Sequence, residues 1–110
     1  MATDWGAVLR DMVSAAEDVA KTEWPKLKDE ANAQFKILTQ VGARIEARKA
    51  AGTISKTNAR FLLAQHKMAA QNVMFSIEGI TNVLVEKAAN AALDVLRTAI
   101  KAATSGWVLF

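Results

Sequence analysis

Few side chains of this 110-residue chain could do acid–base or metal chemistry. His66 is the single histidine and there is no cysteine, which removes disulfides, thiolate metal sites and thiol nucleophiles together. A carboxylate-bridged metal pair in a helical bundle needs Glu-x-x-His segments, and the residue three positions before His66 is Leu63. We therefore interpret His66 as a residue at the edge of an apolar core, with a haem ligand as the alternative.

The other polar residues form no recognisable catalytic pattern. A lone histidine builds a nucleophile triad only with a hydroxyl and an acid in a defined geometry, and none of the four serines has a general base nearby in the sequence. The five glycines are isolated, so the sequence contains no phosphate-binding loop. We expect no enzyme activity, no metal site and no cofactor, with an unrecognised cofactor-dependent activity as the alternative. No motif identifies a family.

Basic residues gather in the middle of the chain, where seven of them between positions 31 and 67 stand against one acid, Glu46. Arg44 and Arg48 are one helical turn apart, and so are Lys56 and Arg60. A reversal of the chain between these pairs would present four cations to one anionic partner. The cluster is explained first as a solvated end of the molecule and second as a polyanion site. The lack of interleaved aromatic residues disfavours nucleic acid.

Apolar residues recur at steps of three and four along most of the chain, which is the periodicity of an amphipathic helix. Pro25 interrupts the first stretch because it lacks a backbone N–H and clashes with the preceding turn. Gly52 ends that stretch, since glycine readily adopts the left-handed conformation that terminates helices. The pattern predicts an all-α fold with a single domain over 1–110. It consists of a helix at about 4–50 with a kink near 22–25, a turn at about 51–55, a helix at about 56–104 and an apolar tail at 105–110.

Two long helices joined by so short a turn form an antiparallel hairpin. Helices of about 47–49 residues would make it about 70 Å long. Residue n then lies roughly opposite residue 107 − n, which places Pro25 and Gly79 near one level. We expect the long hairpin to bend at this level, or its two helices to pack closely there. No cluster of turn-forming residues follows Pro25, so the sequence predicts a kink rather than a reversal.

The second helix carries two adjacent apolar rows, a face too wide for one neighbouring helix to cover. Left in water, this face would exceed the apolar patches that monomers usually expose. We therefore expect self-association, either as a homodimer that forms a four-helix bundle or as a higher oligomer. The candidate interface residues are Leu62, Val73, Ile77, Ile80, Leu84, Leu96 and Ile100.

The last residues form an apolar segment, Trp107, Val108, Leu109 and Phe110, after the helix-ending Gly106. Four large apolar side chains in a row are poorly soluble when they are free in water. We therefore expect the tail to dock, either onto its own bundle or onto another subunit or partner.

No uncharged apolar run approaches the about 20 residues that span a bilayer, and the first residues lack the basic and apolar regions of a secretory signal. The expected location is cytoplasmic. The sequence favours a non-enzymatic helical assembly or adaptor protein whose main partner is a second copy of itself. An amphipathic protein that binds lipid or another apolar surface is one alternative. Another alternative is a protein that binds polyanions or nucleic acid through Arg44, Arg48, Lys56 and Arg60, which we call the basic tip.

Overall fold

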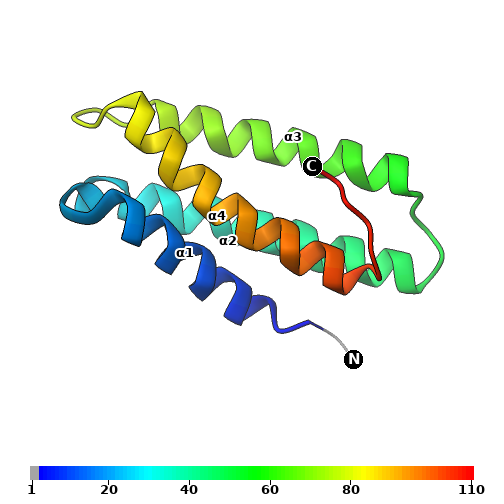
Figure 1. The fold of residues 1–110 in the computed structure, drawn as a ribbon. Helices are drawn as coiled ribbons and strands as arrows, with labels where there is room; N and C mark the ends of the chain where they lie inside the picture. Colours follow the sequence, from blue (N-terminus) through cyan, green and yellow to red (C-terminus); the bar gives the residue numbers. More distant parts are fainter. Residues whose placement is uncertain (1–2) are drawn as a thin grey trace.

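The computed structural model describes residues 3–110, and these form four α-helices and one short 3-10 turn (Figure 1). The elements are α1 (Trp5–Ala20), η1 (Lys21–Glu23), α2 (Trp24–Ala50), α3 (Lys56–Phe75) and α4 (Asn82–Ala103). No β-strand occurs in this part of the chain, so the predicted all-α class is confirmed. Successive helices run in opposite directions, which makes an up-down-up-down bundle.

A tight turn over residues 51–55 joins α2 to α3. Gly52 has a φ of 70°, and the N–H groups of Gly52 and Thr53 donate to carbonyls in the last turn of α2 at 3.0 and 2.9 Å. These bonds satisfy groups that the end of a helix leaves open. Ser55 then caps α3, because its hydroxyl accepts the backbone N–H of Asn58 at 3.1 Å. The two helices lie antiparallel, which is the hairpin layout in outline.

Each half of the hairpin is folded back on itself, which differs from the two long helices expected at about 4–50 and about 56–104. At η1 the chain turns α1 back along α2, where only a kink near 22–25 was predicted. A second reversal spans residues 76–81, where Gly79 has a φ of 81° and Thr81 caps α4. The molecule is therefore 44 Å long, compared with about 70 Å for the straight hairpin.

The reversal at η1 depends on a backbone conformation that the sequence does not indicate. Lys21 has φ 51° and ψ −116°, a region that residues with a side chain avoid and that costs about 1–3 kcal/mol. Pro25 follows at the start of α2, where its missing N–H removes no hydrogen bond. With no glycine at this point, the sequence pattern resembled a kinked helix rather than a turn.

The pairing of residues predicted for the straight hairpin is kept when each half folds back. Lys26 Nζ donates to the carbonyl oxygen of Gly79 at 2.9 Å, so the two reversals lie together, close to the level that the 107 − n rule gives. Val8 of α1 lines a shallow surface hollow with Ala99 of α4, which agrees with the same rule. The fold is thus the expected hairpin folded in half, with α1 still beside α4 and α2 still beside α3.

Side chains from every helix fill the core. The fully buried ones include Met12 of α1, Phe35 of α2, Met74 of α3 and Leu96 of α4, and each contributes about 1.5–3 kcal/mol by its burial. α1 packs mainly on α4, whereas α3 packs mainly on α2. As a result α3 is the least enclosed helix, and its buried residues are Ala59, Leu63, Ala70 and Met74.

Replacing Lys21 with glycine should stabilise the protein. Glycine adopts positive φ without the steric cost that lysine pays, so we expect Lys21→Gly to raise the free energy of unfolding by about 1 kcal/mol. Lys28 is exposed in α2 and provides a matched control, because Lys28→Gly should lower the same quantity by about 1 kcal/mol. Urea unfolding measures both variants. Equal losses in the two would show that residue 21 lies in an ordinary helix.

Candidate functional site

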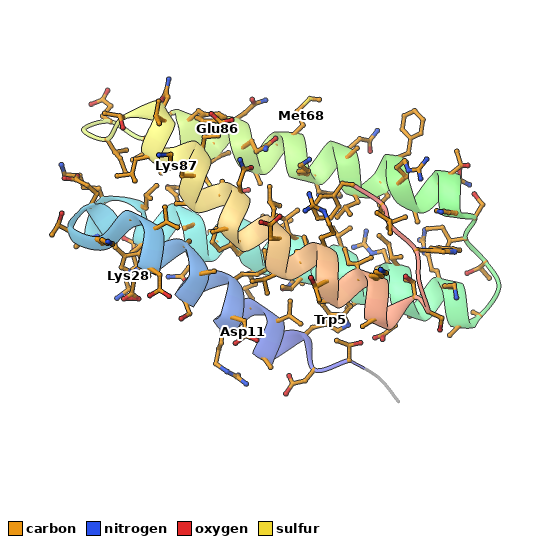
Figure 2. All side chains as sticks on the ribbon, in the orientation of Figure 1. Trp5, Asp11, Lys28, Met68, Glu86 and Lys87 are labelled. Carbon is orange, nitrogen blue, oxygen red and sulfur yellow. The ribbon has the colours of Figure 1, made fainter. Side chains whose placement is uncertain are left out.

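The outer surface of α3 carries three large apolar side chains in a row. The exposed fractions of Phe61, Met68 and Phe75 are 67%, 64% and 37%. Steps of seven residues are close to two helical turns, so all three lie on one side of the helix. Figure 2 shows Met68 pointing outward from α3, away from the rest of the bundle.

The residues that surround this row are exposed and uncharged. Together they form a surface that we call the α3 face: Thr57, Phe61, Ala64, Gln65, Met68, Asn72 and Phe75. Surface helices normally present charged residues to water on the side opposite the core. α3 instead presents aromatic, methionine and amide side chains there, while its buried residues face α2. An exposed apolar row of this kind marks a site of interaction.

Two cations of α3 lie at the edge of this face and contact the C-terminal tail. Arg60 donates from Nη2 to the carbonyl oxygen of Val108 at 3.4 Å. Lys67 Nζ lies 5.0 Å from the centre of the Phe110 ring, a cation–π distance. Both basic groups are therefore drawn to one flank, which leaves the centre of the α3 face without charge.

The tail at 105–110 leaves the end of α4 and crosses to α3 (Figure 1). Gly106 has a φ of 114°, which lets the chain turn away from the helix axis. Leu109 is buried, and Arg97 of α4 donates from Nε to the carbonyl oxygen of Phe110 at 2.7 Å. Lys49 Nζ of α2 lies 5.2 Å from the centre of the Trp107 ring. The tail docks onto its own bundle and ties α2, α3 and α4 together.

Packing within the chain uses much of the apolar surface that the sequence assigned to a second copy. Leu96 and Ile100 are fully buried inside the bundle, so they are not accessible to another chain. The other five predicted interface residues are partly buried: Leu62, Val73, Ile77, Ile80 and Leu84. The α3 face was missed because its members belong to neither of the two apolar rows. The seven-residue spacing of its three largest side chains was the signal that could have found it.

The residues of the predicted basic tip are all exposed: Arg44, Arg48, Lys56 and Arg60. They come from the end of α2 and the start of α3, on either side of the tight turn. Arg60 is the one that also contacts the tail. His66 is half-buried, and among residues 3–110 no group of three or more histidine, cysteine or acidic side chains could hold a metal ion.

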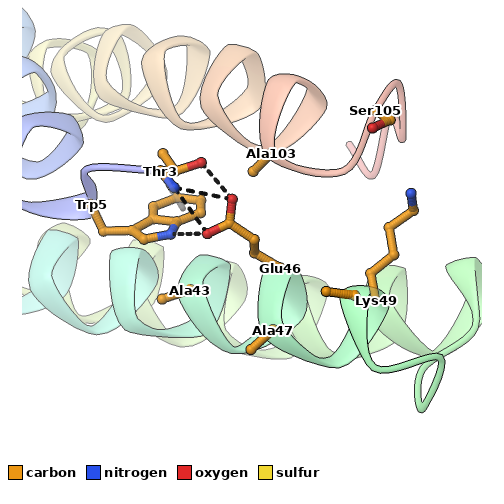
Figure 3. Close-up of a pocket in the computed structure, with 9 residues that line it drawn as sticks. Thr3, Trp5, Ala43, Glu46, Ala47, Lys49, Ala103 and Ser105 are labelled. Carbon is orange, nitrogen blue, oxygen red and sulfur yellow. Dashed lines mark hydrogen bonds between the residues drawn. The ribbon is translucent and has the colours of Figure 1, made fainter. Parts of the chain in front are cut away.

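The carboxylate of Glu46 holds the segment that precedes α1 against α2 (Figure 3). It accepts the hydroxyl and the backbone N–H of Thr3, at 2.6 and 3.2 Å, and the ring N–H of Trp5 at 3.0 Å. The Trp5 ring lies over Gly42, where a Cβ atom would be 2.6 Å from the ring. These contacts border an open pocket of about 650 Å³ that Lys49 and Ser105 also line.

Hydrogen bonds lower the pKa of the Glu46 carboxyl. Partial burial raises the pKa of this carboxyl, but the bonds from Thr3 and Trp5 outweigh burial and leave the pKa below its ordinary value of 4.5. The carboxylate is thus a fixed acceptor that is already engaged. We interpret the pocket as the edge of a structural clamp.

The described helices include none that is long and apolar enough to cross a membrane. Comparison with known proteins adds no assignment. No family model, curated protein or solved structure matches the chain.

The Glu46 clamp predicts a specific response to acid. Because the folded-state pKa of Glu46 is lowered, its charge contributes stability above about pH 4.5, and this contribution is lost as the pH falls through the folded-state pKa. Glu46→Gln should therefore shrink the difference in unfolding free energy between about pH 7 and about pH 3. Glu30→Gln, an exposed site on the same helix, is the control. The same loss at acid pH in Glu46→Gln and the unmodified protein would contradict the clamp.

Proposed function

We propose that this protein is a non-enzymatic helical assembly module that self-associates through the α3 face. The observation that carries the proposal is the exposure of Phe61, Met68 and Phe75 in one uncharged row on a single helix. The other exposed large apolar side chains, Ile37, Val83 and Val108, lie singly on α2, on α4 and in the tail. The inner side of α3 is already occupied by α2, α4 and the tail. A further partner would therefore meet the outer side.

The size of the α3 face sets the strength that we expect. A helix of 20 residues is about 30 Å long, so a contact through this helix alone lies at the small end of protein interfaces, below about 1,200 Å². Fully burying a Phe or Met side chain contributes about 1.5–3 kcal/mol, and lost translational and rotational freedom offsets much of that gain. We expect a dissociation constant that is about micromolar or weaker.

A lipid surface or another apolar surface is the second candidate occupant of the same face. Arg60 and Lys67 at one flank favour it, because cations beside an apolar row attract anionic headgroups. The opposite flank carries the amides Gln65 and Asn72, and transfer of an amide to hydrocarbon is unfavourable. Polyanion binding by the basic tip remains a separate proposal that rests on exposed charge alone.

A charge placed at the centre of the α3 face should abolish self-association. In sedimentation equilibrium at up to several hundred micromolar, we expect the unmodified protein to exceed 11.9 kDa and Met68→Glu to remain at that mass, because an unpaired buried carboxylate is strongly disfavoured. Val83→Glu is the matched control, since Val83 is 63% exposed and Met68 is 64% exposed but Val83 belongs to α4. Thermal unfolding verifies that both variants are folded.

Two outcomes would contradict this proposal. An unmodified protein that stays at the monomer mass over the whole concentration range would remove self-association. Equal loss of association in Met68→Glu and Val83→Glu would mean that the contact lies outside the α3 face. Co-sedimentation with anionic vesicles that Met68→Glu alone abolishes would transfer the face to the lipid-binding alternative.

A further inference from the structure

We infer that the α3 face binds the α3 face of a second copy in antiparallel orientation, with a two-fold axis passing beside Met68. This inference rests on the proposed self-association and adds the partner surface and its register. In this arrangement residue n of one copy lies opposite residue 136 − n of the second copy.

The spacing of the apolar row is symmetric about Met68. Phe61 precedes it by seven residues and Phe75 follows it by seven, so a two-fold rotation maps the row onto itself. Each Phe61 then meets Phe75 of the second copy, and the two Met68 side chains meet at the axis. Aromatic pairs of this kind favour offset or edge-to-face contacts. A strict seven-residue step also fits two helices that cross at about 20°.

Charge complementarity selects the antiparallel direction. The cations Lys56 and Arg60 lie in the first turns of α3, whereas the acid nearest to its other end is Glu78, in the reversal that follows. Glu78 is exposed, and the ion pairs among the described residues do not include it. In the antiparallel arrangement the reversal that carries Glu78 of one copy lies at the same end of the pair as Lys56 and Arg60 of the other. A parallel pair would instead place Lys56 and Arg60 of one copy at the level of the same cations of the other.

The amides of the α3 face also fit a protein partner. Gln65 and Asn72 lie on the same flank of α3, and their numbers sum to 137, so each Gln65 meets Asn72 of the second copy close to the axis. A carboxamide both donates and accepts hydrogen bonds, which lets the two groups satisfy each other. Ala64 lies between the larger side chains and allows a close approach of the helices. The hydrocarbon of a lipid surface would supply no hydrogen-bond partner for these amides.

Cysteine cross-linking tests the register, because the chain has no cysteine of its own. Oxidation of Met68→Cys should give a covalent dimer, since residue 68 faces itself across the axis. Phe61→Cys alone and Phe75→Cys alone should not cross-link, because 14 residues along a helix separate each from its own copy by about 21 Å, and a disulfide needs Cα atoms within about 7 Å. A mixture of Phe61→Cys and Phe75→Cys should form the mixed dimer. Val83→Cys is the exposed control outside the face.

The mass of each variant under reducing conditions separates failure of the register from failure of self-association. Variants that associate when reduced, with Met68→Cys uncrosslinked on oxidation, would overturn the antiparallel register and leave the proposed function standing. Efficient cross-linking of Phe61→Cys with itself would overturn it in favour of a parallel pair. Monomers throughout the concentration range, with the unmodified protein monomeric as well, would overturn both proposals.

Discussion

The width of the apolar surface on α4 constrains the rest of the structure. Its buried residues, from Val85 to Ile100, occupy more of the helix circumference than a single neighbour can cover. In a straight hairpin α4 would have one partner, and much of this surface would stay in water. Folding the hairpin in half surrounds α4 with α1, α2 and α3. The two reversals must then lie at one level, and the bond from Lys26 to Gly79 joins them there.

The sequence predicted the elements whose signals are local. The all-α class, the turn with Gly52 and the hairpin register follow from periodicity, glycine chemistry and a simple count of residues. The reversals were missed for physical reasons. Lys21 adopts a conformation that its residue type disfavours, and burial of the core offsets that cost. The apolar steps of three and four continue across Gly79, through Ile77, Ile80 and Leu84, and a single glycine is compatible with an unbroken helix.

The sequence predicted that apolar surface would remain for an interface, but it did not predict which residues form that surface. The sequence indicated excess apolar surface but placed it on residues such as Leu96, which the folded chain buries by itself. The surface that stays exposed belongs to α3, because this helix packs chiefly on α2 and leaves its other side to water. The tail reinforces the arrangement. It buries Leu109 in the core, and its contacts through Val108 and Phe110 draw Arg60 and Lys67 to one flank, which leaves the uncharged row accessible.

The folding in half of the hairpin is tested most directly by small-angle X-ray scattering. The Met68→Glu variant suits this measurement because self-association would not add to the particle size. Our account predicts a radius of gyration near the 13.9 Å of the Cα atoms and a longest dimension near 44 Å, each increased slightly by side chains and hydration. A radius of gyration of about 20 Å with a longest dimension of about 70 Å, the values for a straight hairpin, would contradict it.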